Sequence, residues 1–363
     1  MNALPKTMAA VLLTGHGGFD KLEYREDVPV PQPKMGEVLI RVLAAGVNNT
    51  DINTRTAWYS KTNEGATQGG GKATSATAAV DATWGGEALQ FPRIQGIDVC
   101  GRIVAVGSGV NSSRMGERVL VDPCLREPVQ WESFQAHFLG SECNGGFAQY
   151  CVAPAIHTHK IECSLTDAEL ASFPCAYSTA ENLLHRMKLA AGETVLVTGA
   201  SGGVGSAAVQ LAKRRGAKVI AVAAEEKGAS VVALGAERVV PRGENLVEAL
   251  GRECLEAVVD LVAGPQWPEL FDLLKPGGRY ATAGAIAGPI VPLDVRTLYL
   301  KDLSFFGCTV LDREVFPNLI CYIERGEVQP VVAATFPLSE IVKAQQLFLS
   351  KKFTGKLVLL PPS

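Results

Sequence analysis

Metal-binding pairs, long apolar runs and a strong net charge are all missing from this 363-residue sequence. No two of the nine cysteines are spaced as C-x-x-C, which argues against a zinc knuckle, and their odd number argues against a disulfide framework. No apolar stretch approaches the roughly 20 residues of a transmembrane helix, and the apolar run near residue 10 is shorter than a signal-peptide core. The net charge of -3 offers no basic surface for nucleic acid or an anionic membrane. We therefore expect a cytoplasmic protein that binds neither.

What the chain does contain is a dinucleotide-binding pattern in residues 194–222. An apolar run at 195–198 predicts a strand, a helical pattern follows from 203, and a second apolar run at 219–222 predicts a parallel strand. Glycines fill the turn between strand and helix, where they allow a pyrophosphate to approach the helix N-terminus. Some other glycine-rich turn is the alternative, but strand, helix and second strand all stand in place, which favours nucleotide binding. The predicted phosphate-binding residues are Ser201, Gly202, Gly203, Val204 and Gly205.

Two patterns divide the chain into domains. Up to about residue 155, short alternating strands with Gly and Pro turns predict an all-β domain. From residue 165, strands alternate with helices, which predicts a doubly wound parallel sheet. A helix at 313–325, another capped by Ser339 and a last strand at 356–360 end the chain. The six strands predicted for the parallel sheet are 195–198, 219–222, 238–240, 257–261, 279–283 and 303–306.

One segment interrupts the first domain. Residues 60–86 are rich in Gly, Ala and Thr and have no periodicity, which is typical of a functional lid or of a mobile surface loop. Trp58, Tyr59 and Trp84 flank the segment and are candidates to cover a binding cleft. The histidines show no ligand spacing, and His157 and His159 alternate as on a solvated strand edge.

Successive stretches of the chain resemble the landmarks of the medium-chain dehydrogenase/reductase superfamily. They are GEVLIRVLAAGVNNTD, FPRIQGIDVCGRIVAVG, NGGFAQYCVAP, TGASGGVGSAAVQLAK, LLKPGGRYATAG and TGKLVLLPP. The resemblance covers nearly the whole chain and implies an α/β protein with two domains. A GroES-like catalytic domain would comprise residues 1–160, completed by 308–363, and a Rossmann domain would comprise 161–307.

The positions at which zinc-dependent members bind their metal differ here. Where those members have Cys, a His-Glu pair and a second Cys, this chain has Asn48, Ile97 with Asp98, and Cys175. Catalytic zinc needs three protein ligands and an open position, so Asp98 and Cys175 would form half a site. The pattern is similar to the zinc-free quinone oxidoreductase branch, and we expect no zinc. The resemblance implies NADPH-dependent reduction of a quinone or an α,β-unsaturated carbonyl.

The cofactor preference follows from the end of the second strand of the nucleotide-binding pattern. The acidic residue that selects NAD through the ribose hydroxyls is replaced by Ala223 and Ala224. Lys227 and Arg242 are candidates to bind a 2′-phosphate, which favours NADPH over NADH. The alternative is that Lys227 begins a solvated helix and that Glu225 binds the ribose.

The resemblance adds further cofactor contacts. Thr179 is placed near the nicotinamide, the backbone at Gly284 and at Phe306 beside its carboxamide, and Lys356 at a position where the family often has lysine. A surface lysine on the terminal strand is an equally good interpretation of Lys356.

Without a metal, hydrogen-bond donors must polarise the substrate oxygen. Asn48 is the first candidate for that donor, Asp51 would position it or deliver a proton through water, and Tyr59 is the alternative proton donor. The alternative for Asn48 and Asp51 is a turn that only fixes its own backbone.

Three classes of function remain open at the level of the sequence. They are a zinc-independent NADPH reductase, an alcohol dehydrogenase acting on alcohols or aldehydes, and a nucleotide-binding protein with little turnover. The apolar strand at 303–310 predicts an exposed sheet edge, and with the resemblance it favours a homodimer or a homotetramer.

Overall fold

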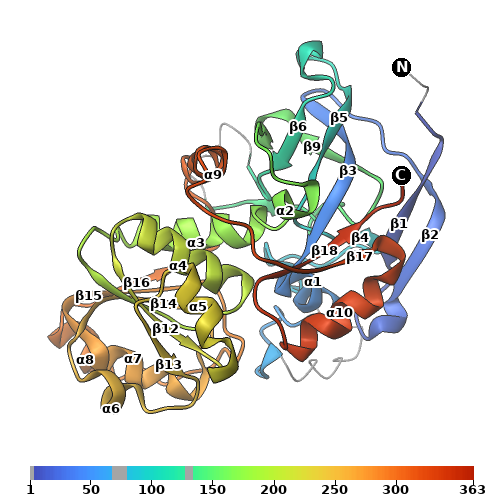
Figure 1. Cartoon of the computed structure of the whole chain (residues 1–363). Helices are drawn as coiled ribbons and strands as arrows, with labels where there is room; N and C mark the ends of the chain where they lie inside the picture. Colours follow the sequence, from blue (N-terminus) through green and yellow to red (C-terminus); the bar gives the residue numbers. More distant parts are fainter. Residues whose placement is uncertain (1–3, 68–79, 127–133) are drawn as a thin grey trace.

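The computed structural model describes residues 4–67, 80–126 and 134–363, which form two domains side by side (Figure 1). The nucleotide domain is built on a parallel sheet. The other domain, which we call the catalytic domain, is built on sheets whose strands pair antiparallel except for one parallel pair at the edge of the largest sheet. Within the described ranges no helix is long and apolar enough to cross a bilayer.

The nucleotide domain contains a six-stranded parallel sheet in the order β13-β12-β11-β14-β15-β16. Its middle strand β11 is buried on both sides: Val195 and Val197 belong to the core on one face of the sheet, and Leu196 to the core on the other. Such two-sided burial is typical of parallel sheets covered by helices. The strands are β11 (Thr194–Val197), β12 (Lys218–Ala223), β13 (Arg238–Pro241), β14 (Leu255–Asp260), β15 (Leu274–Thr282) and β16 (Ser304–Gly307).

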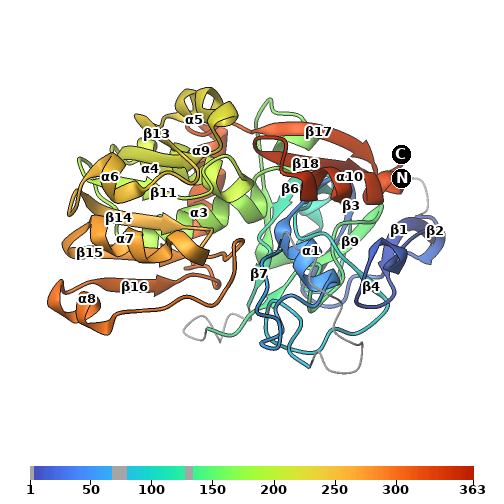
Figure 2. The same cartoon turned by 90° about the horizontal axis from the view of Figure 1, so that it is seen from below.

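Helices connect these strands and cover the two faces of the sheet (Figures 1 and 2). Among them, α3 and α4 pack against each other, and α4 also packs on β11 and β12. The helices are α3 (Pro174–Arg186), α4 (Gly203–Arg214), α5 (Gly228–Leu234), α6 (Leu246–Leu250), α7 (Trp267–Leu273) and α8 (Val295–Leu300). All six predicted strands are present, which confirms the predicted parallel sheet of an α/β fold.

The main sheet of the catalytic domain has seven strands, in the order β10-β6-β5-β3-β18-β17 with β9 also paired to β3. Two smaller sheets, β2-β1-β4 and β7-β8, complete it. The strands are β1 (Thr7–Leu13), β2 (Leu22–Pro29), β3 (Glu37–Val47), β4 (Arg93–Ile94), β5 (Cys100–Val106), β6 (Arg118–Val121), β7 (Cys124–Leu125), β8 (His137–Phe138), β9 (Tyr150–Pro154), β10 (Thr158–Lys160), β17 (Val332–Pro337) and β18 (Lys356–Leu360).

The two ends of the chain meet in this sheet. Strand β18 pairs antiparallel with β3, with Leu357 opposite Val47 and Val358 opposite Gly46. This register brings Lys356, the first residue of β18, beside the turn that follows β3. Helix α9 (Val315–Glu324), which comes before β17, packs against α3. In the segment between α9 and β17, the Gln329 carbonyl accepts a hydrogen bond of 2.5 Å from the Tyr177 hydroxyl of α3.

Three local predictions were wrong. The all-β first domain contains helix α1 (Asn49–Arg55), because Asn48 and Asp51 begin a helix rather than an isolated turn. Ser339 lies inside a 3-10 turn, and the helix that follows, α10 (Ile341–Ser350), is preceded by Glu340. His157 is buried and not solvated, since its ring contacts the Asp122 carboxylate and the Arg126 backbone.

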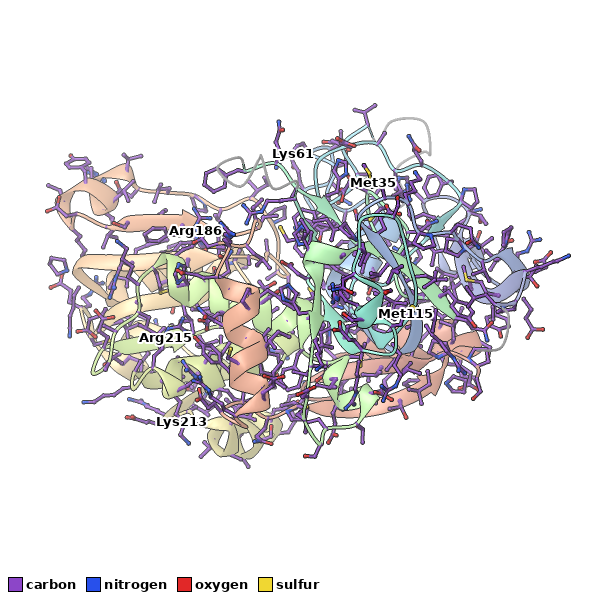
Figure 3. The ribbon with its side chains drawn as sticks, turned by 90° about the horizontal axis from the view of Figure 1, so that it is seen from above. Met35, Lys61, Met115, Arg186, Lys213 and Arg215 are labelled. Carbon is purple, nitrogen blue, oxygen red and sulfur yellow. The ribbon has the colours of Figure 1, made fainter. Side chains whose placement is uncertain are left out.

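The side chains fill the space along the boundary of the two domains (Figure 3). Arg186, Lys213 and Arg215 belong to the nucleotide domain, and Met35, Lys61 and Met115 to the catalytic domain. Arg215 is held by the buried carboxylate of Glu181, which makes two hydrogen bonds with it at 2.5 and 2.7 Å. This ion pair holds α3 against the C-terminal end of α4 within the nucleotide domain.

Candidate active site

The glycine turn after β11 has the geometry of a phosphate-binding turn. Gly199 has a φ of 61°, which glycine adopts without strain, and Gly202 caps α4. A Cβ on Gly205 would lie 2.2 Å from the Gly199 carbonyl oxygen, so only glycine allows the helix to start this close to the turn. On Gly202, by contrast, a Cβ would find its nearest neighbour at 3.4 Å. The open side of the turn at Gly202 therefore leaves the first amides of α4 able to bind an anion.

The segment between α10 and the last strand, residues 351–356, contacts the nucleotide domain at three points. At one end, the Lys227 ammonium donates hydrogen bonds to the carbonyls of Lys351 (2.5 Å) and Phe353 (2.8 Å). In the middle, the Gly355 amide donates to the Ser201 carbonyl at 3.0 Å. At the other end, the aliphatic chain of Lys356 contacts Gly203, where an added Cβ would lie 2.9 Å from Lys356 Cδ.

Lys356 ends in a buried cluster with Asp98 and Asn48. Its ammonium lies 2.8 Å from Asp98 Oδ2 and donates a second hydrogen bond to Asn48 Oδ1. Asn48 in turn donates through Nδ2 to Asp98 Oδ2 at 2.8 Å and to the Gly46 carbonyl at 3.3 Å. The side chains of Lys356 and Asp98 are 4% and 0% exposed, so this is a buried ion pair that is hydrogen-bonded on both sides. Of the two interpretations of Lys356, the surface lysine is wrong.

This cluster limits what Asn48 can donate to a substrate. Both hydrogens of its amide already have acceptors, Asp98 and Gly46, and its amide oxygen accepts from Lys356. Asn48 would have to give up one of these bonds to bind a substrate oxygen.

Asp51 is held mainly by backbone amides. The Asn48 amide donates to Asp51 Oδ2 at 2.8 Å, and the Gly96 amide donates to Oδ1 at 3.3 Å. Burial raises the pKa of Asp51 to about 7, against the opposing effect of the Asn48 amide, and the nearby charge of Asp98 raises it further. Asp51 thus fixes the start of α1, and its carboxyl titrates near neutral pH.

Tyr59 lies beyond the end of α1 and faces the same helix. Its hydroxyl lies near the side chains of Thr50 and Asn53, and Cys175 and Asp51 lie close enough to influence its charge. Burial raises the pKa of Tyr59 to about 12, so the phenol carries its proton at neutral pH. A protonated phenol beside the cluster is suited to donate a proton.

Cys175 and Thr179 complete the cluster from helix α3. The Cys175 amide donates to Asp98 Oδ1 at 2.6 Å, and its thiol makes a hydrogen bond with Thr179. Burial raises the pKa of the Cys175 thiol, and the negative charge of Asp98 raises it further. The predicted residues Asn48, Asp51, Tyr59, Thr179 and Lys356 are therefore brought together.

The donor set does not fit a catalytic zinc ion. Asn48 and Ile97 stand at two of the ligand positions, and the Lys356 ammonium contacts both Asn48 and Asp98. In the part of the chain that the structure describes, no three His, Cys, Asp or Glu side chains are grouped so that they could hold a metal.

The residues expected to determine the choice between NADPH and NADH lie near the start of residues 351–356, at the end opposite Lys356. Ala223 ends β12, Ala224 follows, and Glu225 is exposed at the start of a 3-10 turn that ends at Lys227. The positive charges of Arg242 and Lys351 act on Lys227, and burial lowers its pKa. Burial also lowers the pKa of Lys351 to about 8, and Lys227 lowers it further.

The predicted carboxamide contacts, Gly284 and Phe306, lie near the carboxyl ends of β15 and β16. The described start of the insertion reaches this place, since the Thr67 amide donates to the Ile286 carbonyl at 3.1 Å. Part of the predicted lid, residues 68–79, lies outside the described residues. Of the aromatic residues that flank it, Trp58 packs edge-on against Tyr59, whereas Trp84 stacks on Phe138.

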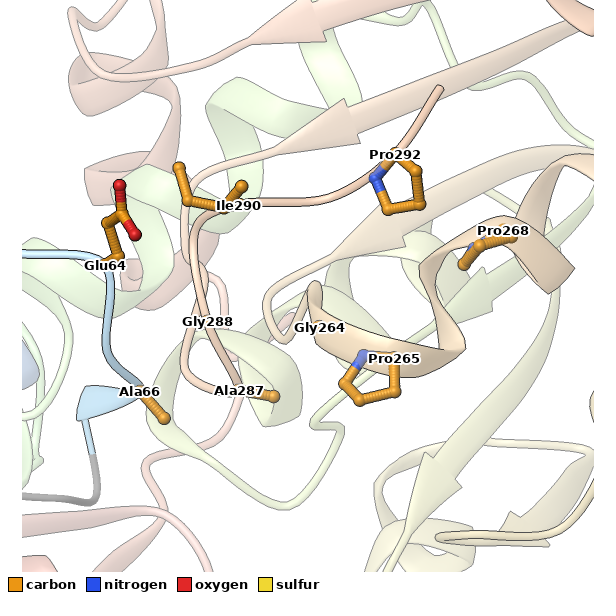
Figure 4. A pocket seen from close by; sticks show the side chains of 9 residues that line it. All are labelled: Glu64, Ala66, Gly264, Pro265, Pro268, Ala287, Gly288, Ile290 and Pro292. Carbon is orange, nitrogen blue, oxygen red and sulfur yellow. The ribbon is translucent and has the colours of Figure 1, made fainter. Parts of the chain in front are cut away.

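A hollow of about 370 Å³ lies where the insertion meets the nucleotide domain (Figure 4). Glu64 and Ala66 line it on one side, and Pro265, Ala287 and Ile290 are among its residues on the other. None of the cluster residues around Lys356 lines it. The hollow is therefore separate from the cluster.

Sequence reasoning missed the partners that organise the cluster. Asp98 was considered only as half of a metal site, whereas the structure makes it the acceptor for Lys356, Asn48 and Cys175. The sequence also gave no sign that Thr50 and Asn53 lie near the Tyr59 hydroxyl. The one available signal was the run NNTDIN after Val47, in which Thr50 and Asn53 are three residues apart and share a face once α1 is recognised as a helix.

Comparison with known proteins gives consistent similarities. Residues 34–163 match the alcohol dehydrogenase GroES-like domain, and residues 203–325 match the zinc-binding dehydrogenase domain. The chain is 30% identical to acryloyl-coenzyme A reductase of Metallosphaera sedula, over 97% of this chain and 99% of that protein. It is 30% identical to quinone oxidoreductase of Lama guanicoe, over 98% of each. The crystal structure of a putative alcohol dehydrogenase from Sinorhizobium meliloti is 47% identical, covers 99% of this chain and 98% of its own, and superposes with a TM-score of 0.87.

Proposed function

Because the chain belongs to the medium-chain dehydrogenase/reductase superfamily and is an NAD(P)H-dependent oxidoreductase, we propose that it transfers a hydride from NADPH to a quinone or an α,β-unsaturated carbonyl, without a metal. Two relatives, a quinone oxidoreductase and an acryloyl-coenzyme A reductase, have names that fit these two substrate classes.

The observation that carries the proposal is the buried cluster of Lys356, Asp98 and Asn48. It stands at the positions from which zinc-dependent members of the family bind their metal, and its donors do not fit zinc. Alcohol oxidation in those members relies on a metal to stabilise an alkoxide. Reduction of a conjugated carbonyl needs only donors that stabilise an enolate, which a hydrogen-bonding site supplies.

The residues of the site then have separate tasks. When bound, the cofactor supplies the hydride, and the turn at Gly199–Gly205 holds its pyrophosphate. Thr179 and the backbone at Gly284 and Phe306 orient the nicotinamide ring. Tyr59, whose pKa is raised to about 12 by burial, delivers a proton to the substrate carbon or oxygen.

The cationic residues beyond β12 support NADPH as the cofactor. Ala223 and Ala224 offer no carboxylate to the ribose hydroxyls, and Lys227 and Arg242 lie near each other where a 2′-phosphate would lie. Glu225, the alternative ribose-binding residue, is exposed. We also propose that the chain acts as a homodimer or a homotetramer in the cytoplasm.

The test is a paired measurement on the purified protein. Oxidation of NADPH and of NADH is followed at 340 nm with 1,4-benzoquinone and with 3-buten-2-one, and metal content is determined on the same sample. NADPH-driven reduction of either acceptor, without stoichiometric zinc, supports the proposal. Stoichiometric zinc together with alcohol-dependent reduction of NADP would refute it. Cofactor binding without turnover of any acceptor would favour a nucleotide-binding protein instead.

A further inference from the structure

We infer that the ammonium of Lys356 is the fixed positive charge of this active site and stabilises the negative oxygen that hydride transfer creates on the substrate. The inference rests on the proposed function and deepens it, because it names the group that takes over the electrostatic task of the missing metal. It also changes the role of Lys356 from a cofactor contact to a catalytic residue.

The Lys356 ammonium lies among the segments that bind zinc in the metal-dependent relatives. It contacts Asn48, which stands at one zinc-ligand position, and Asp98, whose backbone neighbour Ile97 stands at a second. Asp98 also accepts from the amide of Cys175, the third such position. A single cation is therefore surrounded by the three segments that surround the metal in those relatives.

The hydrogen bonds of this ammonium leave one donor unused. An ammonium has three hydrogens, and Lys356 uses one for Asn48 Oδ1 and one for Asp98 Oδ2. No further acceptor binds Lys356 among residues 4–67, 80–126 and 134–363. One N–H therefore has no acceptor among these residues, and it is the donor that we assign to the substrate oxygen. By contrast, Asn48 has already used both of its amide hydrogens, so Lys356 is the better donor of the two.

Burial strengthens the effect of this charge. An isolated charge in such a place would be very unfavourable, and the Asp98 carboxylate at 2.8 Å offsets this cost. In a site from which water is excluded, a charge–oxygen interaction is stronger than in water, because the local dielectric is low. The pair stays in place because Lys356 begins β18, whose register against β3 fixes its backbone beside Val47.

Lys356 also lies close to the expected place of the cofactor. Its aliphatic chain lies against Gly203, the first residue of α4, so the ammonium extends past the phosphate-binding turn toward Asn48. Thr179, expected near the nicotinamide, is hydrogen-bonded to Cys175 in the same cluster. Lys356 and Thr179 therefore belong to one cluster, which begins beside the phosphate-binding turn.

An α,β-unsaturated ketone would react in two steps. A hydride from the reduced nicotinamide forms a C–H bond at the β-carbon, the C=C π pair moves to form a C=C bond to the carbonyl carbon, and the C=O π pair becomes a lone pair on oxygen. Lys356 donates a hydrogen bond to that enolate oxygen and keeps its proton. The enolate then takes a proton at the α-carbon from Tyr59, which regains it from water.

The experiment replaces Lys356 with Ala and with Met and compares both with Lys352→Ala, a neighbouring lysine that is exposed and has no part in the cluster. Reduction of 3-buten-2-one by NADPH is measured for each purified protein, with NADPH binding followed separately by fluorescence titration. We expect kcat to fall about 100-fold or more in both Lys356 variants, the magnitude seen when an oxyanion donor is removed. NADPH affinity should change by no more than a few-fold, and Lys352→Ala should behave as wild type.

Chemical rescue separates a catalytic charge from a structural one. Ethylamine added to Lys356→Ala should raise kcat, since an ammonium can enter the space that the side chain left, and it should not affect Lys356→Met, which fills that space. The double variant Asp98→Asn/Lys356→Met removes both charges and leaves no unpaired carboxylate. If Lys356 served only to neutralise Asp98, this double variant would recover the activity of Asp98→Asn alone. We expect that it does not.

The possible failures are distinguishable. If wild-type protein reduces neither acceptor, the proposed function fails. If the wild type is active and Lys356→Ala keeps more than about a tenth of its kcat, or loses NADPH binding instead, the inference about Lys356 is wrong while the proposed function stands.

Discussion

The Lys356 ammonium and the Asp98 carboxylate lie 2.8 Å apart although 258 residues separate them in the chain. The pair is almost fully buried, and it connects the last strand of the protein to the segment between β4 and β5. Its position carries the proposal that Lys356 polarises the substrate, since the resemblance to zinc-dependent members of the family places their metal ligands at Asn48, Ile97 and Cys175.

Tyr59 is expected to supply the proton that completes the reduction. Replacing Tyr59 with Phe removes the hydroxyl and preserves the ring that packs against Trp58. We expect kcat to fall about 10²-fold, within the usual contribution of general acid catalysis, with an unchanged KM for NADPH. Steady-state kinetics with 3-buten-2-one measures both values.

The control for Tyr59 is Trp58→Phe, which preserves the phenol and changes only its aromatic neighbour. Equal losses of kcat in the two variants would indicate a packing role for Tyr59. A solvent isotope effect on kcat that is present in wild type and unchanged in Tyr59→Phe would also contradict the assignment.

The residue after β12 is expected to control the choice of cofactor. Ala224→Asp places a carboxylate where a ribose hydroxyl would donate a hydrogen bond to it and where a 2′-phosphate would be repelled. We expect the ratio of kcat/KM for NADPH to that for NADH to fall by about 10²-fold. Ala229→Asp, an exposed change in the following helix α5, is the matched control and should leave the ratio unchanged. A ratio that rises or stays constant in Ala224→Asp would exclude this position as the determinant.

Lys351 is expected to make the stability of the protein depend on pH in alkaline solution. Its pKa is lowered by burial from 10.5 to about 8, so between these values the unfolded chain binds more protons than the folded one. Stability therefore rises as the pH increases from about 8 toward 10.5, on the order of 1 kcal/mol for this group. Urea unfolding at pH 7.5 and 9.5 measures the change.

Lys351→Met should be more stable than wild type at pH 7.5 and should lose this part of the pH dependence. Lys352→Met is the matched control, because Lys352 is the next residue in the chain, is also a lysine and is exposed. If the two variants show the same difference between pH 7.5 and 9.5, Lys351 is not the group responsible.

Strand β16 is expected to be part of a subunit interface. It is the edge strand of the parallel sheet, and helix α8 lies at the same edge (Figure 2). Val295, Tyr299 and Leu300 of α8 are between 60% and 71% exposed, although they are apolar or aromatic. An unpaired edge beside exposed apolar side chains favours pairing with a second copy. Light scattering at micromolar concentration should therefore give the mass of a dimer or a tetramer.

Leu300→Glu should shift this mass toward the monomer by placing a charge at the interface. Val232→Glu is the control, since Val232 is also exposed but belongs to α5, away from this edge. A monomeric mass for the wild-type protein would contradict the proposed assembly.

Several features of the fold were predictable because each depends on residues close together in the sequence. The six strands of the parallel sheet follow from short apolar runs, and the glycine turn follows from Gly199 to Gly205, whose backbone crowding is local. The errors arose where local patterns compete. Asn48 and Asp51 are compatible with an isolated turn and with a helix start, and only the packing of α1 decides between them.

The amino-acid sequence by itself therefore determined the parallel sheet and the glycine turn after its strand β11, because hydrophobic periodicity and glycine spacing are properties of short segments. The family followed from the resemblance of successive motifs. The sequence also showed that two zinc-ligand positions are filled by Asn48 and Ile97. Only the tertiary structure decided what stands there instead. Strand β18 pairs with β3, although the two strands are some three hundred residues apart in the sequence. This register brings the Lys356 ammonium to Asn48 and Asp98. No local pattern predicts that contact. A lysine can be buried only where a carboxylate pairs with it, and which carboxylate lies beside Lys356 depends on how β18 pairs with β3.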